Sequence, residues 1–415
     1  MHATIENPNP YLLRFQQLLT QSALVARRYV EAEGLTTPLS DAARERAQNV
    51  LGYTLKAAEA WAATRELLLA MAPKMELAGQ RSEWLPYLVD GVAQSQRQGD
   101  QAAEAALQFQ CGYLYRLMSN YAEAHSSLSA SAAHYAVLGD AEGQARALNQ
   151  LAYLAWQQHR YEEAERLAHA ALTIVDDMTL EKAVSLSALG LVANDRSRYA
   201  EAENYHCEAL LIRSHHAAEK EMARSLQNLG LALSQQGKYA RAIEYYERAL
   251  TLLDAVYDPG HKAIIQMNLG GAYHLQGDHC KALDLLTAAE ESLRQLSDGF
   301  NLAKLLTTKG LCYLAQCQWQ LAEQAFKASS DLFQQLDDLS WYLNAYDGLG
   351  ISYLEQEQFE QALTIFKEII VQLPKIEGTP AYKYLTTTLT LQIAQAEAKQ
   401  VDRGKSVYLP SKNQD

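Results

Sequence analysis

The sequence is poor in the features that mark secreted, membrane-spanning and nucleic-acid-coating proteins. Its five cysteines fall in different parts of the chain, which is not a disulfide framework. No stretch of about 18 apolar residues is long enough to span a membrane, and no basic start precedes an apolar run as in a signal peptide. The formal net charge of −13 argues against a surface that coats nucleic acid. We therefore expect a cytoplasmic protein without membrane or nucleic-acid partners.

Motifs for catalysis are also missing. Gly404-Lys405-Ser406 resembles the end of a phosphate-binding loop, but Lys399 stands where the first glycine of that loop is required. The sequence has no zinc-protease helix motif, no paired-cysteine zinc spacing and no nucleophile turn. Its 49 acidic residues are scattered over polar helix faces. We expect no enzyme, no cofactor and no catalytic residues.

One three-residue pattern recurs seven times. A small residue is followed nine positions later by an aromatic residue or histidine, and three positions after that by alanine. Five of the six steps between copies are 40 residues long, and the step from Ala152 to Gly190 is 38. The copies are Gly112/Tyr121/Ala124, Ala152/Tyr161/Ala164, Gly190/Tyr199/Ala202, Gly230/Tyr239/Ala242, Gly270/His279/Ala282, Gly310/Trp319/Ala322 and Gly350/Phe359/Ala362.

Each copy predicts a pair of helices, as in 223–236 and 239–255, where apolar residues follow helical spacing on either side of a Gly-Lys turn. The small residue and the alanine mark the closest approach of the paired helices, so we expect them to be structural anchors. The aromatic residue opens the second helix and fills the wedge between repeats. Because one such unit cannot bury its own apolar face, neighbouring units must stack. The pattern predicts an all-α solenoid.

This pattern resembles the tetratricopeptide repeat, which the segment NLGLALSQQGKYARAIEYYERAL (228–250) matches almost position for position. The resemblance implies a right-handed solenoid of antiparallel helix pairs. The repeats exceed the common 34-residue unit, and such long repeats are similar to the C-terminal arrays of bacterial STAND-type regulators and to peptide-pheromone receptors. The likeness to STAND-type regulators implies a separate effector or ATPase subunit, because this chain has no ATPase module.

The repeats divide the chain into segments with different expected roles. Residues 1–62 predict an N-terminal helical region that either caps the array or acts as an output module. In the next segment, Trp84 replaces the third-anchor alanine. After the repeats, apolar residues at helical spacing predict a cap and then a polar tail. The expected boundaries are 63–100 for a divergent repeat, 101–380 for seven repeats, 381–400 for the capping helix and 401–415 for a disordered tail.

The resemblance also locates a binding surface, because ligands of tetratricopeptide proteins lie along the concave face formed by the first helices. Carboxamides two residues before the small anchor suit pairing with a peptide backbone. Basic residues six before it favour an acidic ligand, and aromatic residues follow some anchors. These predicted peptide-binding residues are Gln110, Gln150, Asn228 and Asn268, then Arg146, Arg224 and Lys304, and finally Tyr113, Tyr153 and Trp156.

Three functional hypotheses follow. The first is a non-enzymatic regulatory scaffold or sensor that binds a peptide or protein segment. The second is a structural or oligomerisation protein whose groove is filled by its own tail or another copy. The third, an enzyme, rests only on His274, His279 and Cys280, with Cys317 one repeat on. We interpret those residues as packing rather than metal ligands, since His279 occupies the aromatic position of its repeat. The sequence leaves the oligomeric state open.

Overall fold

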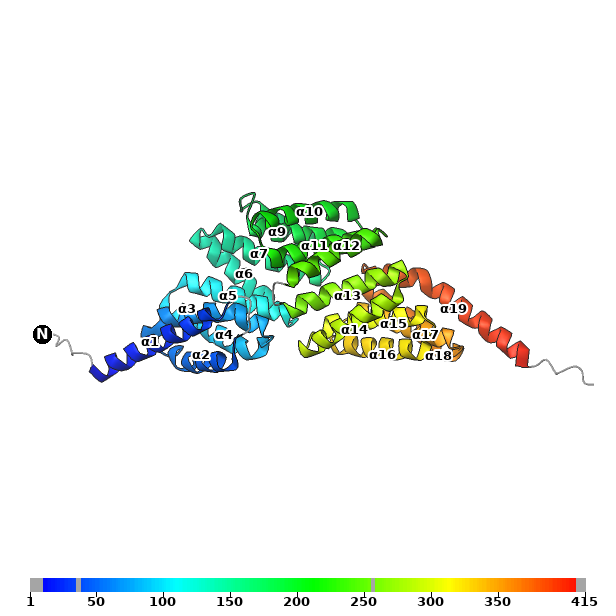
Figure 1. Ribbon diagram of the computed structural model, residues 1–415, viewed down its shortest axis with the longest axis horizontal. Coiled ribbons are helices and arrows are strands. Elements are labelled where there is room, and N and C mark those ends of the chain that lie inside the picture. Colours follow the sequence, from blue (N-terminus) through cyan, green and yellow to red (C-terminus); the bar gives the residue numbers. More distant parts are fainter. Residues whose placement is uncertain (1–9, 35–38, 255–257, 408–415) are drawn as a thin grey trace, which may run out of the picture. The chain divides into compact units, whose positions relative to one another are not determined.

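The computed structural model describes residues 10–34, 39–254 and 258–407, and within these ranges it consists of 19 α-helices, two short 3-10 helices and no strand (Figure 1). The predicted all-α solenoid of helix pairs is confirmed. The chain divides into two compact units. Unit 1 comprises residues 1–225 with 254–258, and unit 2 comprises residues 226–253 with 259–415.

Seven helix pairs make up the repeats, and each second helix begins at the aromatic or histidine position of its copy. The pairs are α5 (Gln101–Leu117) with α6 (Tyr121–Leu138), α7 (Ala141–Gln157) with α8 (Tyr161–Leu172), α9 (Leu180–Asp195) with α10 (Tyr199–His215), α11 (Glu219–Gln235) with α12 (Tyr239–Leu253), α13 (Pro259–Gln276) with α14 (His279–Gln295), α15 (Gly299–Ala315) with α16 (Trp319–Gln335), and α17 (Leu339–Glu355) with α18 (Phe359–Gln372).

The flanking segments are helical as well. The chain before the repeats forms α1 (Pro10–Ala32), α2 (Asp41–Thr54), α3 (Trp61–Leu77) and α4 (Arg81–Gln98), with the 3-10 helix η1 (Ala58–Ala60) before α3. A second 3-10 helix, η2 (Leu373–Ile376), precedes α19 (Pro380–Val407), which runs past residue 400, while residues 408–415 of the predicted tail lie outside the described residues.

One helix differs from its prediction. The sequence favours a single long helix that begins after Ser40 and includes Leu55 and Trp61. The Ser40 hydroxyl does cap this helix by accepting from the Ala43 amide, but α2 ends at Thr54 and a 3-10 turn precedes α3. The interruption gives Leu55 and Trp61 separate places in the core, where they are 7% and 6% exposed.

Local chemistry fixes where the helices of each pair begin and end. The first helices α5, α7, α15 and α17 are each capped by an aspartate side chain that accepts a backbone N–H of the first turn. In each pair the chain turns toward the second helix seven positions after the small anchor, at a residue with positive φ. That residue is Ser119, His159, Ser197, Gly237, Gly277, Cys317 or Glu357.

The small anchors lie where paired helices pack without room for a larger side chain. A Cβ built on Gly230 would lie 2.6 Å from the Tyr246 ring, and Tyr246 is 1% exposed. At the glycine anchors even a methyl group would crowd the partner helix and force the helix axes apart.

The third anchors are buried in every copy of the pattern. Each of these alanines is at most 1% exposed, so none of them is accessible to a ligand. They contribute to the packing of the helices and are not part of a binding surface. The seven residues are Ala124, Ala164, Ala202, Ala242, Ala282, Ala322 and Ala362.

Candidate functional site

The predicted peptide-binding residues fall in both units. Seven belong to unit 1, while Asn228, Asn268 and Lys304 belong to unit 2. The contacts of each residue distinguish side chains that join helices from side chains that can reach a ligand.

Several of these residues are already engaged with neighbouring helices. The Arg146 guanidinium donates to Glu181 at 3.0 Å and to Glu142 at 3.2 Å. The Trp156 indole N–H donates to Asp195 at 2.8 Å. The contacts with Glu181 and Asp195 link α7 to α9, so these side chains hold successive repeats together. In unit 2, the Lys304 ammonium lies 5.1 Å from the ring centroid of Trp341.

The predicted carboxamides divide in the same way. The Gln150 amide oxygen accepts from the Arg116 guanidinium at 3.1 Å. Gln110, Asn228 and Asn268 are half-buried, and their side chains form no hydrogen bond with any described residue. Their donors and acceptors are therefore available to a backbone amide of a ligand.

A group of arginines and tyrosines gathers in unit 1, and we name Tyr113, Arg116, Tyr153, Arg213 and Arg224 the Arg–Tyr patch. The Arg116 guanidinium carbon lies 5.4 Å from the Tyr113 ring centroid and 5.9 Å from the Tyr153 centroid. The charges of all three arginines act on the Tyr153 hydroxyl, so residues from α5, α7, α10 and α11 converge.

The three arginines of this patch form no ion pair with a carboxylate among the described residues. Arg116 donates to the amide oxygens of Gln150 and Gln157, both at 3.1 Å. Arg213 is 4% exposed and donates to the Ser225 hydroxyl and the Ala183 carbonyl, while its Nε has no partner in the described part of the chain. Arg224 is exposed to solvent. Each guanidinium thus keeps donor capacity or charge that a carboxylate can satisfy.

Electrostatics at the patch reflect burial and crowding of like charge. Burial lowers the pKa of both Arg116 and Arg213, and the positive charge of Arg224 lowers them further. Burial, together with the nearby Glu76, raises the pKa of Tyr113 to about 12, and the Tyr113 hydroxyl donates to Glu76 at 2.8 Å. Carboxylates also act on the patch: although burial lowers it, the pKa of Arg224 is raised overall by Tyr113, Asp258, Glu221 and Glu76, and Glu221 and Glu181 act on Arg213. None of these carboxylates forms an ion pair with an arginine of the patch among the described residues.

Sequence reasoning missed Arg116 and Arg213, although the repeat alignment contains a signal for Arg213. It lies 23 residues after the small anchor Gly190, on the second helix α10. The predicted binding residues were all chosen on first helices, so Arg213 was not among them. In every other copy this position is apolar, so a charged residue there breaks the packing pattern. The equivalents are Tyr135, Val175, Leu253, Leu293, Phe333 and Leu373.

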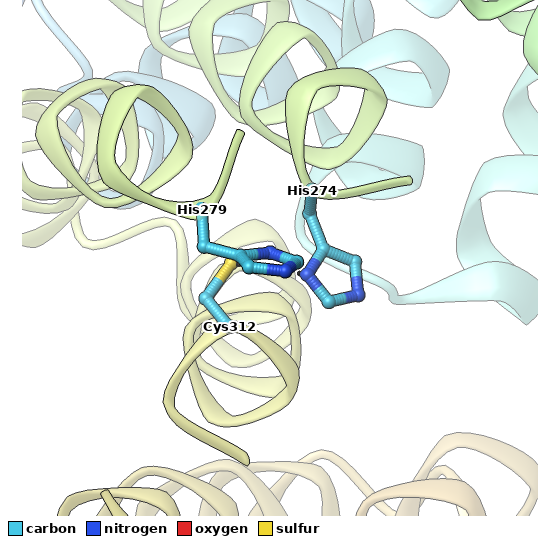
Figure 2. A group of neighbouring side chains, drawn as sticks. All are labelled: His274, His279 and Cys312. Carbon is cyan, nitrogen blue, oxygen red and sulfur yellow. Dashed lines mark hydrogen bonds between the residues drawn. The ribbon is translucent and has the colours of Figure 1, made fainter. Parts of the chain in front are cut away.

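The structure also brings together a histidine–cysteine cluster in unit 2, in which Cys312 takes the place of the Cys280 and Cys317 considered from the sequence. His274, His279 and Cys312 lie together, and their potential ligand atoms are all within 4.8 Å of one another (Figure 2). Cys280 and Cys317 are exposed and do not belong to the cluster. Burial lowers the pKa of His274 and raises that of the Cys312 thiol to about 12.

Protein-family models match three segments of the repeat region. Residues 221–295 and 301–370 match one model described as tetratricopeptide repeat, and residues 144–175 match another with the same description. These segments are tetratricopeptide repeats. No curated protein sequence matches the chain.

Solved structures share the tetratricopeptide-repeat fold at low sequence identity. A Rap protein complexed with competence and sporulation factor is 15% identical, with a TM-score of 0.58 over 91% of this chain and 99% of the other. NprR in complex with its cognate peptide NprX is also 15% identical, with a TM-score of 0.51 over 75% and 91%. The STAND protein PH0952 from Pyrococcus horikoshii, which has a tetratricopeptide-repeat sensor, is 12% identical, with a TM-score of 0.57 over 96% and 66%.

None of the described helices combines the length that a membrane span requires with a sufficiently apolar composition.

Proposed function

We propose that this chain is a non-enzymatic regulatory scaffold that binds a peptide or protein segment, and that the Arg–Tyr patch holds an acidic group of that segment. The observation that carries the proposal is the convergence of Arg116, Arg213 and Arg224 around Tyr153 without an ion pair from the described residues. A protein of net charge −13 has no general excess of arginine to place there.

The physical reason is the cost of keeping these charges together. Arg213 is buried, and its neighbours in hydrogen bonds are a hydroxyl and a carbonyl, which do not neutralise its charge. A buried cation without a carboxylate partner is destabilising. A ligand carboxylate would accept charge-assisted hydrogen bonds from Arg116 or Arg224 and relieve the repulsion. The tyrosine rings would pack against the apolar part of the same ligand.

The fold comparisons support this proposal at the level of architecture. The Rap and NprR structures, similar in fold, are described as complexes with a factor and with a peptide. In this chain, Gln110 is half-buried on α5, the helix that also carries Tyr113 and Arg116. Its carboxamide would pair with the backbone of a segment anchored at the Arg–Tyr patch. Arg146 is left out of the binding surface because Glu181 and Glu142 hold its guanidinium.

Residues 1–62 are proposed to transmit the binding event, either directly or to a separate effector subunit. The helix α1 contacts α2 and α3, and the core around them continues to Leu107 and Leu114 of α5. A ligand that shifts α5 would therefore act on the packing of the N-terminal helices.

The binding test uses fluorescein-labelled synthetic pentapeptides that share a neutral sequence and differ in a free C-terminal carboxylate, an amidated C-terminus or added glutamates. Fluorescence anisotropy with the full chain is expected to rank the acidic peptides tightest. Arg224→Glu is expected to weaken their binding at least about tenfold, because reversing one charge of a close pair costs more than about 1.4 kcal/mol.

Arg146→Ala is the matched control, since Arg146 also lies six residues before a small anchor but forms an ion pair with Glu181 within the protein. It should bind the acidic peptides as the unaltered chain does. Equal affinity for acidic and amidated neutral peptides would contradict the proposal, and so would an Arg224→Glu variant that binds as tightly as the Arg146→Ala control.

A further inference from the structure

We propose that His274, His279 and Cys312 form a binding site for a single Zn²⁺ ion, where the turn between α13 and α14 packs against α15. Figure 2 shows the His274 and His279 imidazole rings side by side, tilted relative to one another, with the Cys312 sulfur next to the His279 ring. Nitrogen and thiolate sulfur are the donors that Zn²⁺ prefers. This site is independent of the Arg–Tyr patch, because all three residues belong to unit 2.

One distance in the cluster matches that of a tetrahedral zinc site. Zn–S and Zn–N bonds of roughly 2.3 and 2.0–2.1 Å place a sulfur and a nitrogen about 3.6 Å apart across a tetrahedral angle. The Cys312 Sγ lies 3.5 Å from His274 Nδ1. The ring centroids of His274 and His279 are 5.1 Å apart, and all potential ligand atoms lie within 4.8 Å. Small side-chain rotations would therefore complete the set without moving a helix.

Unsatisfied polar atoms give the second line of evidence. The Nδ1 of His279 is buried and has no hydrogen-bond partner among the described residues. Leaving such an atom unpaired costs about 1–3 kcal/mol. Cys312 is fully buried, and His274 Nδ1 is its contact in the cluster. If His279 served only to pack, an aromatic ring without buried nitrogens would fill the same place at lower cost.

The repeat alignment shows that this pair of consecutive copies, joined at the α13–α14 turn and α15, differs from every other pair at all three positions together. The positions are four and nine residues after one small anchor and two residues after the next. No other pair of consecutive copies has a ligating residue at all three. The sets at the other joints are Arg116/Tyr121/Leu154, Trp156/Tyr161/Val192, Asn194/Tyr199/Ala232, Ser234/Tyr239/Ala272 and Leu314/Trp319/Ser352.

Three protein ligands leave the fourth position of a tetrahedral Zn²⁺ ion to a water molecule. Cys280 does not supply it, because its exposed sulfur lies 3.6 Å from the Gln316 amide nitrogen, outside the cluster. Bound Zn²⁺ would join α13, α14 and α15, and thus connect two consecutive repeats through one ion. Zn²⁺ binding would then stabilise these repeats against unfolding, and the stabilisation would grow as the free Zn²⁺ concentration rises.

The test measures metal binding to the full chain with Zn²⁺ in competition with a chromophoric chelator, and with Co²⁺ as a spectroscopic substitute. The unaltered chain should bind one equivalent. Its Co²⁺ form should show a thiolate-to-metal charge-transfer band and the strong visible bands of tetrahedral Co²⁺. Zn²⁺ should also raise the thermal unfolding midpoint.

Two variants remove ligands without disturbing the repeat. His279→Phe restores an aromatic ring at the aromatic position, and Cys312→Ala places there the residue that Ala232 and Ala272 supply in other copies. Both variants should lose at least about 100-fold in Zn²⁺ affinity, because mutating residues that only support metal ligands already costs up to about 100-fold. The charge-transfer band should vanish in Cys312→Ala. Cys280→Ser is the control and should bind as the unaltered chain does. The proposal is overturned if the unaltered chain shows no thiolate band, or if Cys312→Ala, folded by circular dichroism, binds Zn²⁺ equally well.

Discussion

Gly270 and Gly271 are adjacent in α13, and replacing each by alanine gives a matched pair that tests the packing of the repeats. A Cβ on Gly270 would lie 2.9 Å from Leu286 Cγ and 3.2 Å from the Ala282 carbonyl oxygen, whereas a Cβ on Gly271 would have nothing within 4 Å. Leu286 and Ala282 are fully buried, so neither has free space to move into. The crowded contact belongs to one position only.

The magnitudes follow from two opposing effects. Each substitution gains about 0.5–1 kcal/mol because alanine forms helix better than glycine. Overpacking costs the Gly270→Ala variant about 1–3 kcal/mol as well, so its net effect should be a destabilisation of about 0–2.5 kcal/mol. Gly271→Ala should stabilise by the propensity gain alone.

Native-state hydrogen exchange of the α13 and α14 amides is the suitable assay, because a repeat array can unfold in steps and a single midpoint then averages over distant repeats. The two variants should differ by about 1–3 kcal/mol in local opening free energy, with Gly271→Ala the more stable. If Gly270→Ala is as stable as Gly271→Ala, the small anchors do not mark the closest helix approach.

Three further predictions concern buried polar groups. Burial lowers the pKa of His206 to about 3, so its ring stays neutral in the folded protein while the unfolded chain binds a proton below pH 6.5; stability should fall by up to about 1.4 kcal/mol per pH unit from 6.5 toward 3, and denaturation of His206→Leu should lack this slope. Burial raises the pKa of Asp347 from 3.8 to about 6, so the folded form retains a proton and loses stability as the pH rises from 4 through 6; Asp347→Asn should protect α19, where Tyr384 and Gln392 donate to this carboxyl, from hydrogen exchange at pH 7. Arg213→Leu restores the apolar residue that the other copies have at this position. It should raise the thermal unfolding midpoint and weaken binding of the acidic pentapeptides; unchanged peptide affinity would remove Arg213 from the patch.

The fold was predictable because two residues in each copy, the small anchor and the alanine, mark where the paired helices pack closely. Tyr239 begins α12 and Trp319 begins α16 where the pattern places the second helices. The break after Thr54 was not predictable in this way. That region lies outside the repeats, so no second copy shows which of its apolar residues face the core.

The candidate sites were predictable only in part, since a repeat fixes positions along a helix and not contacts between repeats. The pattern locates Tyr113, Tyr153 and Arg224 on first helices, and these residues do gather in unit 1. Arg213 comes from a second helix, α10, and donates to Ser225 of the next first helix, α11. Likewise, Cys312 replaces Cys280 in the histidine–cysteine cluster because the next first helix, α15, packs against the α13–α14 turn.

The central claim is that an acidic segment binds at the Arg–Tyr patch, and hydrogen–deuterium exchange of the full chain with and without the tightest acidic pentapeptide tests it most directly. The account predicts slower exchange in α5, α7 and the segment from Arg213 to Arg224, and no such change in the Arg224→Glu variant at the same peptide concentration. Slower exchange confined to α15–α18, or unchanged exchange around Tyr113 and Tyr153 with peptide bound, would contradict it.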